Sequence, residues 1–231
     1  MLILTIDTSC NQLGVSLNED DMVLAEQMIN NKKTHSVKLM PAIDNILSVS
    51  NKSIKDVDLF AVVKGPGSFT GLRIGVSTAK AFAYTLDKPI VGINTLDYLA
   101  NSVANFKGLI CPIIDARNNH VFYSIYRGKE RIYDYKVDDV NNLCHILNEF
   151  NEDVYFTGDG VIDHRENLKD QLGSKYNENE MPLLLGKPSF LAVLAKEKFT
   201  EGQLEEDVKV FYMRKSQAER MKEERAGKAC K

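Results

Sequence analysis

The chain has 231 residues, of which 44% are hydrophobic, and a formal net charge of −3 at pH 7. A chain of this length buries roughly 70 to 75% of the surface that its unfolded form exposes, which allows one large domain or two lobes and excludes a disordered protein. The slightly acidic balance argues against a protein that wraps nucleic acid with a broad basic face.

The cysteines indicate neither a zinc site nor a disulfide framework, because none has CxxC spacing. They stand at Cys10, Cys111, Cys144 and Cys230. Isolated thiols of this kind are typical of a reducing cytosol. No apolar run is long enough to span a membrane, and Met1 leads directly into strand residues rather than into a basic leader segment. We therefore expect a cytoplasmic protein.

The chain begins with three short strands joined by tight turns, which form a β-meander. The predicted strands are Leu2–Ile6, Gly14–Leu17 and Met22–Glu26. The first turn contains Asp7-Thr8-Ser9, in which a carboxylate can hold a hydrated cation and hydroxyl groups can meet phosphate. The alternative is an ordinary Asx turn with no ligand.

Apolar residues at helical spacing then predict an amphipathic helix from Ser36 to Leu47. His35 precedes this helix, but Leu39 stands four residues on, so no pair of metal ligands is present here. Its broad apolar face can pack on a sheet or on a partner.

A glycine-rich loop follows the next predicted strand, Asp58–Lys64, and leads into a helix from Leu72 to Leu86. Its glycines are Gly65, Gly67, Gly71 and Gly75. A strand, such a loop and a helix N-terminus can bind an anion, because the first helical turn presents unpaired N–H groups. The spacing matches neither the P-loop nor the dinucleotide fingerprint, so a tight connection that permits close packing is an equal alternative. A strand at Pro89–Ile93 completes a βαβ unit.

The second half of the chain begins in the same style. Gly108–Ile114 is predicted as a strand, and Val121–Tyr126 as the returning strand. An apolar strand that ends in an acidic turn thus occurs twice, at Asp7 and at Asp115, which suggests two related lobes. The rest reads as helices at 140–150, 161–172 and 188–199, a strand at 154–157, and a charged segment at 211–231.

Four motifs, taken in order, resemble those of the bacterial TsaB (YeaZ) family. They are Ile6–Ser9, the glycine loop Gly65–Gly75, Pro112–Arg117 and Phe211–Arg214. The likeness runs from Met1 to about Arg220; Val210 departs from the family's usual proline, which affects only the local turn. The resemblance implies an α/β protein with the actin/Hsp70/sugar-kinase (ASKHA) fold, in which each of two related lobes has a mixed β-sheet flanked by helices.

This resemblance also implies the domain plan and the function. The expected plan is a first, partner-binding lobe at 1–105, a smaller second lobe at 106–208, and a C-terminal helix and basic tail at 209–231 that pack back on the first lobe. The implied function is to form N6-threonylcarbamoyladenosine in tRNAs that read ANN codons. In that pathway TsaB-like proteins dimerise with the TsaD transferase subunit and help to recruit the TsaE ATPase, and contact with tRNA is indirect or weak.

TsaD-like proteins carry an HxxxH metal pair on the helix after the strand that corresponds to Pro89–Ile93. In this sequence the two positions fall at Thr95 and Leu99. Leucine cannot ligate a metal, and a threonine hydroxyl is a poor substitute for imidazole. We therefore expect no metal site and no catalytic residue in this chain, which predicts a non-catalytic scaffold or activator subunit.

In kinases of the ASKHA fold the two hairpin turns hold phosphate. The resemblance places the remains of such a nucleotide site at Asp7, Thr8, Ser9, Asp115, Gly158 and Gly160. Arg117, next to Asp115, can instead form an ion pair across the cleft and fill the site. We expect no cofactor in the isolated chain, and ATP or ADP at the interface with the partner is left open.

The partner, a TsaD-like subunit or a second copy of this chain, is expected to dock on the two helices of the first lobe. The candidate interface residues are Leu39, Met40, Ile43, Gly71, Ile74, Ser77, Lys80 and Tyr84. An interface of this kind needs a buried apolar centre. Each helix also has an inward stripe, so about half of the apolar candidates face their own sheet instead.

Two other function classes are open from the sequence. In an ATP-dependent kinase or hydrolase of the same fold, Asp7 and Asp115 would hold hydrated Mg²⁺, and Thr8, Ser9 and the glycine loop would hold phosphates. In a protease Ser68 would be the nucleophile, but its surroundings are not GxSxG, and the sequence ties no histidine or aspartate to it.

Overall fold

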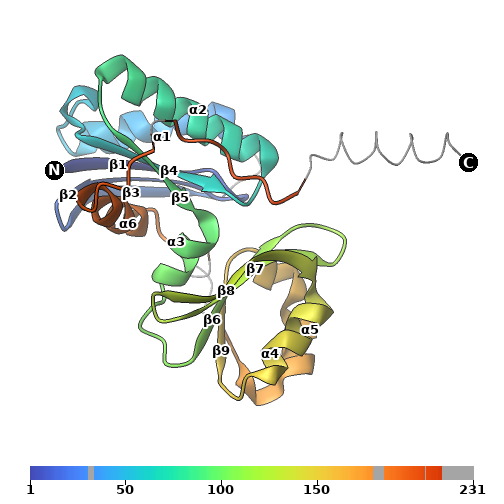
Figure 1. Ribbon diagram of the computed structural model, residues 1–231. Helices are drawn as coiled ribbons and strands as arrows, with labels where there is room; N and C mark the ends of the chain where they lie inside the picture. The colour runs from blue at the N-terminus through green and yellow to red at the C-terminus, as the bar shows by residue number, and fades with distance from the viewer. Residues whose placement is uncertain (31–33, 179–184, 206, 215–231) are drawn as a thin grey trace, which may run out of the picture.

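The computed structural model describes residues 1–30, 34–178, 185–205 and 207–214, which form two α/β lobes (Figure 1). The first lobe is built on a five-stranded sheet in the order β3-β2-β1-β4-β5. β1 to β3 form an antiparallel meander, and β4 and β5 run parallel to β1. The strands are β1 (Leu2–Asp7), β2 (Leu13–Glu19), β3 (Met22–Ile29), β4 (Leu59–Gly65) and β5 (Ile90–Asn94). The predicted meander and βαβ unit are confirmed.

Helices cover both faces of this first sheet, which explains why its central strand is apolar throughout. β1 is buried along its whole length, and its successive side chains point to opposite faces. Leu4 and Ile6 lie in one core cluster with α1 and α2, whereas Ile3 lies in another with α3 and α6. The helices are α1 (His35–Val49), α2 (Phe69–Leu86), α3 (Thr95–Asn101) and α6 (Ser189–Thr200).

The second lobe repeats the strand order of the first. Its sheet runs β10-β9-β6-β7-β8, with an antiparallel meander β6 to β8 and with β9 parallel to β6. α4 and α5 close the core on one face. The elements are β6 (Leu109–Asp115), β7 (His120–Arg127), β8 (Glu130–Asp139), α4 (Val140–Glu149), β9 (Val154–Thr157), α5 (Gly160–Leu172) and β10 (Tyr176–Glu178), and short 3₁₀ helices lie at Ile54–Asp56 and Gly173–Lys175. The repeated pattern of an apolar strand that ends in an acidic turn, at Asp7 and at Asp115, therefore belongs to two sheets with the same topology.

After the second sheet the chain crosses back to the first lobe. α6 contacts β1, β2, β4 and β5 and contributes Leu191 and Ala195 to the core there, so it lies with the first lobe although the sequence grouped 106–208 with the second. Residues 207–214, hereafter the strap, follow the same course. The Phe211 N–H donates to the Lys64 carbonyl at 2.7 Å. Of the predicted C-terminal helix, 209–214 are not helical and 215–231 lie outside the described residues.

Two structural features bear on the predicted location of the protein: the state of its cysteines and the character of its helices. Cys10, Cys111 and Cys144 are free thiols, and Cys230 lies outside the described residues. Within the described ranges, no helix combines the length and the apolar character needed to cross a membrane. A cytoplasmic location remains a prediction.

A hydrogen-bonded cluster joins the two lobes. The carboxylate of Asp97, on α3, accepts hydrogen bonds from the hydroxyls of Tyr126 at 2.7 Å and Tyr135 at 2.8 Å, both on the second sheet. The guanidinium of Arg131 lies 3.9 Å from the same carboxylate. Tyr126 is 1% exposed, so water cannot readily replace the carboxylate as its acceptor.

We expect Asp97→Ala to lower the free energy of unfolding by roughly 1 to 3 kcal/mol, because it leaves a buried tyrosine hydroxyl without an acceptor. Urea unfolding measures the change. Asp134→Ala is the matched control, since the Asp134 side chain is 86% exposed, and it should change stability by less than about 0.5 kcal/mol. Equal losses in the two variants would show that the cluster does not join the lobes as described.

Candidate functional site

The cleft between the lobes brings together the turns that end β1, β6 and β9. β1 ends at Asp7 and β6 at Asp115, while β9 leads through Gly158 and Asp159 into α5. Asp7, Gly158 and Asp159 line a space of about 10 Å³. That space has room for no more than about one water molecule. The structure thus brings half of the six predicted nucleotide-site residues, Asp7, Ser9 and Gly158, to one small space that is nearly filled.

Asp7, Thr8 and Ser9 are buried and already hydrogen-bonded within the protein. The Asp7 carboxylate accepts hydrogen bonds from the Ser9 N–H at 2.9 Å and from the Ser9 hydroxyl at 2.7 Å. The Thr8 hydroxyl donates to the Gly71 carbonyl at 2.8 Å. All three residues are at most 3% exposed, and burial raises the pKa of the Asp7 carboxyl, partly offset by its bonds to Ser9. The geometry matches the Asx-turn alternative.

The turn after β6 is held by hydrogen bonds from backbone N–H groups to aspartate side chains. The Asp115 N–H donates to the Asp159 carboxylate at 3.2 Å, and the Arg117 N–H donates to the Asp115 carboxylate at 2.8 Å. Within the described part of the chain the Arg117 guanidinium forms no ion pair, so the ion pair across the cleft that the sequence allowed is not found there. A Cβ at Gly160 would press on the backbone of β6, so this glycine lets α5 approach the turn.

The carboxyl group of Asp159, in the same cleft, also has a raised pKa. Burial raises its pKa to about 6, and repulsion by Asp115, Asp163 and Asp7 adds to the rise, while the hydrogen bond from the Asp115 N–H opposes it. The folded protein therefore holds this proton more tightly than the unfolded chain, whose ordinary value is 3.8. The protonated Asp159 carboxyl therefore contributes to the stability of the fold below about pH 4, and this contribution is lost as the pH rises to about 6.

Asp159→Asn should therefore gain stability relative to the parent as the pH rises. The amide cannot ionise, and its oxygen still accepts from the Asp115 N–H. We expect the difference in free energy of unfolding to grow by about 1 to 3 kcal/mol between pH 4 and pH 7, measured by urea unfolding at a series of pH values. Asp170→Asn, at an exposed carboxylate of the same helix, should show no such growth. Parallel profiles for Asp159→Asn and the parent would refute the shift.

The glycine loop sets the N-terminus of α2 against the first hairpin turn. The Ser68 N–H donates to the Ser9 carbonyl at 2.6 Å, and the Ser68 hydroxyl accepts from the Gly71 N–H at 3.3 Å as the helix cap. A Cβ at Gly71 or Gly75 would collide with Thr8. Of the two alternatives that the sequence allowed, an anion site and a tight connection, these contacts match the tight connection.

A larger cavity of about 740 Å³ opens beside this loop. Pro66–Thr70 form one wall, the strap residues Phe211–Arg214 a second, and Ile114–Arg117 a third. The charged residues of its lining are Arg73, Asp115, Arg117, Asp159 and Arg214. The volume lies in the range of small-molecule and cofactor sites.

Three of the predicted partner contacts lie inside the first lobe. Leu39 and Ile43 are 2% and 1% exposed and belong to the core between α1 and the sheet. Gly71 is buried against Thr8. None of the three can touch a partner directly, because they lie on the inward stripes of their helices. This part of the interface prediction is corrected.

The other five candidates lie at or near the outer face of α1 and α2. Met40 is 43% exposed and Tyr84 is 92% exposed, and Ser77 is also exposed. Ile74 is partly buried against the core, and Lys80 forms an ion pair with the strap. Met40, Ser77 and Tyr84 thus remain free to contact a partner.

Comparison with known proteins assigns the chain to a family. The model of the TsaD family, described as tRNA N6-adenosine threonylcarbamoyltransferase, matches residues 22–182. Over 202 residues the chain is 39% identical to the tRNA threonylcarbamoyladenosine biosynthesis protein TsaB of Bacillus subtilis, which covers 86% of this chain and 88% of that protein. The chain belongs to the TsaB family.

Solved structures share the fold of this TsaB-family chain. YeaZ from Pseudomonas aeruginosa matches with a TM-score of 0.74 at 21% identity, over 89% of this chain and 97% of that one. The activator of the 2-hydroxyisocaproyl-CoA dehydratase from Clostridium difficile, with bound ADPNP, matches with a TM-score of 0.52 at 10% identity, over 88% and 97%. At such identities these likenesses show the fold alone, and they confirm the predicted ASKHA architecture.

In this TsaB-family protein, the two positions that correspond to the TsaD-like metal pair have structural roles. The Thr95 hydroxyl donates to the Pro66 carbonyl at 2.6 Å and so ties α3 to the glycine loop. Leu99 is 4% exposed and packs in the core. In the described ranges no three His, Cys, Asp or Glu side chains are grouped as a metal site.

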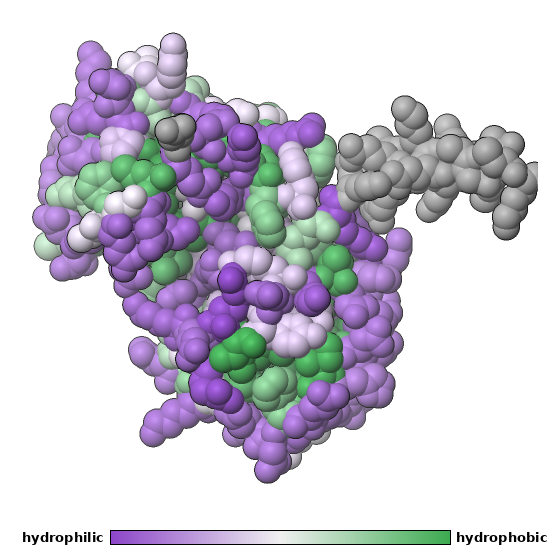
Figure 2. Space-filling view, viewed as in Figure 1, coloured by the Kyte–Doolittle hydropathy of each residue, from purple (hydrophilic) through white to green (hydrophobic). Residues whose placement is uncertain are grey.

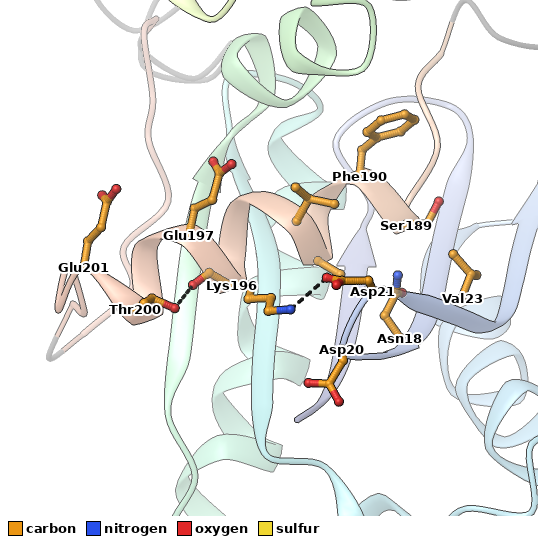
Figure 3. A pocket seen from close by; sticks show the side chains of 12 residues that line it. Asn18, Asp20, Asp21, Val23, Ser189, Phe190, Lys196, Glu197, Thr200 and Glu201 are labelled. Atoms are coloured by element: carbon orange, nitrogen blue, oxygen red, sulfur yellow. Dashed lines mark hydrogen bonds and ion pairs between the residues drawn. The ribbon is translucent and has the colours of Figure 1, made fainter.

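A groove beside α6 was not predicted from the sequence. It has a volume of about 590 Å³ and lies between α6 and the turn that joins β2 to β3 (Figure 3). Val23, Phe190 and Val193 give it apolar surface, and Lys196 pairs with Asp21 at 2.8 Å. Nothing in the sequence signals this groove, because it exists only where α6 meets the hairpin. The strap residues of the larger cavity did have a signal, since Phe211–Arg214 is one of the four family motifs.

Proposed function

We propose that this chain is a non-catalytic subunit in the formation of N6-threonylcarbamoyladenosine in tRNAs that read ANN codons, where it pairs with a TsaD-like transferase subunit and helps to recruit a TsaE-like ATPase. The pathway follows from the family, whose curated members are named tRNA threonylcarbamoyladenosine biosynthesis proteins. The observation that carries the non-catalytic role is the state of Asp7, Thr8 and Ser9. Their polar groups are buried and bonded to one another and to Gly71.

The same observation separates this proposal from a kinase or hydrolase. The hydroxyls that would meet phosphate already donate within the protein, and the space beside Asp7 measures about 10 Å³. We therefore propose that the isolated chain binds no ATP or ADP beside Asp7. ATP or ADP at the interface with the partner remains part of the proposal.

The proposed docking surface for the TsaD-like subunit, or for a second copy of this chain, is the outer face of α1 and α2. These helices lie together on the face of the first sheet that is turned away from the second lobe (Figure 1). Val37, Met40 and Tyr84 expose large apolar or aromatic side chains there, at 62%, 43% and 92%. Exposed side chains of this kind, gathered on one face, mark interaction surfaces.

Reconstitution of tRNA modification tests the proposal. A TsaD-like subunit, a TsaE-like ATPase, threonylcarbamoyl-adenylate and unmodified tRNA are combined with and without this chain, and the modified nucleoside is quantified by mass spectrometry. We expect product only when the folded chain is present, and none when an equal amount of unrelated protein replaces it. Product at the same rate without this chain would refute the proposed role.

A further inference from the structure

The 740 Å³ cavity beside the glycine loop is lined by aromatic and arginine side chains on one side and by two aspartates on another. We propose that it receives one unpaired nucleotide of a tRNA, with the base against the aromatic wall of the strap and the phosphate at the arginine rim. This inference rests on the proposed function, which makes tRNA the substrate of the complex.

Arginines gather at this cavity in a chain whose net charge is −3. Arg73 comes from α2, Arg117 from the turn after β6, and Arg214 from the strap. Among the described residues, neither Arg73 nor Arg117 pairs with a carboxylate. Arg73 instead donates to the Tyr212 hydroxyl at 2.8 Å. Two guanidinium groups are thus available to an anion, and their fork matches the oxygens of a phosphate.

Aromatic rings adjoin the guanidinium group of Arg73. The Phe69 and Tyr212 ring centroids lie 4.7 Å apart, and the Arg73 guanidinium carbon lies 3.9 Å from the Phe69 centroid. Tyr212 is 42% exposed and Phe211 is 36% exposed, so ring surface is left for a ligand. Unpaired bases stack on such rings and on guanidinium planes. A cavity that combines these rings with two arginines that pair with no described carboxylate therefore fits a ligand that is both planar and anionic.

The distribution of charge favours an RNA strand over a free nucleoside triphosphate. The inner end of the cavity is acidic: it holds Asp115 and Asp159, and Asp159 also borders the small space beside Asp7. A polyphosphate that reached this end would meet like charge. Arg73 and Arg117 are exposed at the rim, where the backbone of a longer strand can continue into solvent.

Fluorescence anisotropy with the full chain tests the proposal, and the probe is a labelled RNA stem-loop of the anticodon-arm type. Arg117→Gln should weaken binding and reduce the slope of log Kd against log salt by about one, as expected for a lost phosphate contact. Tyr212→Ala should weaken binding about fivefold to a hundredfold through lost stacking. Tyr212→Phe keeps the ring and should bind much more tightly than Tyr212→Ala.

Arg127→Gln is the charge-matched control, because Arg127 pairs with Glu152 at the far end of β7. It should bind like the parent, and thermal unfolding confirms that every variant is folded. Parent-like binding by Arg117→Gln and Tyr212→Ala overturns the proposal, and so does an equal loss in Arg127→Gln. Equal affinity for a fully paired duplex overturns the assignment to an unpaired nucleotide. Binding of ATP, but not of the stem-loop, overturns the assignment to RNA.

The two proposals fail separately. RNA binding is measured without partner subunits or the threonylcarbamoyl donor, so its absence leaves the reconstitution result standing. A chain that binds the stem-loop through Arg117 and Tyr212, yet adds nothing to tRNA modification, would refute the proposed function and not this site.

Discussion

The double variant Met40→Asp/Tyr84→Asp is expected to lose co-purification with a TsaD-like partner while it folds like the parent. In the free chain these side chains are 43% and 92% exposed, so two carboxylates there stay hydrated. In an interface the same carboxylates would be buried without partners, which is strongly unfavourable. We expect the affinity to fall by on the order of a hundredfold or more, as for the loss of central interface residues. Pull-down and titration calorimetry measure it.

Val193→Asp provides the matched control for this surface. Val193 is 50% exposed on α6, a helix that packs on the opposite face of the first sheet. We expect this variant to bind the partner like the parent. Parent-like affinity of the double variant, or an equal loss with Val193→Asp, would contradict the proposed docking surface. Size-exclusion chromatography of the free chain shows whether the same face also joins two copies.

Ile43→Ala should lower the free energy of unfolding by about 2 to 5 kcal/mol, because it removes buried methyl groups and leaves a cavity. Met40→Ala, one turn earlier on α1, should change it by less than about 0.5 kcal/mol. Ile43 is 1% exposed and packs in the core between α1 and the sheet, whereas Met40 is 43% exposed. Urea unfolding of both variants measures the contrast. Equal losses would show that α1 is rotated relative to this description.

The local elements were predictable because their signals are local. The apolar run Leu2–Ile6, the returning strand Gly14–Leu17 and the glycine loop each specify backbone conformation through neighbouring residues alone. The two strands are found there and are one to three residues longer than predicted, whereas α2 begins at Phe69 instead of Leu72, so that Gly71 and Gly75 of the predicted loop are helical. The repeat of an apolar strand and an acidic turn at Asp7 and Asp115 likewise predicted two related lobes, and the structure gives their sheets the same strand order.

The candidate site was predictable only in part. The sequence named the turns that meet in the cleft, and the structure brings Asp7, Gly158 and Asp159 together. It could not show that the Thr8 hydroxyl is already used, because its partner, the Gly71 carbonyl, is decided by how the glycine loop packs on the first turn. The bond from the Ser9 hydroxyl to Asp7 is local and matches the Asx turn that the sequence left as an alternative. It also allowed an ion pair of Arg117 across the cleft, whereas in the described residues Arg117 contacts Asp115 through its backbone N–H.

By itself, then, the sequence determined most of the strands and helices, the two related lobes and the family motifs, but it did not indicate the strands β8 and β10. Only the tertiary structure decided which stripe of α1 is inside, so that Leu39 is core and Met40 is surface. It alone placed α6 on the first sheet and the strap beside the glycine loop. The physical reason is that periodicity specifies that a face must be buried, whereas the residues that bury it are distant in sequence and are chosen by shape and by hydrogen bonding in the folded chain.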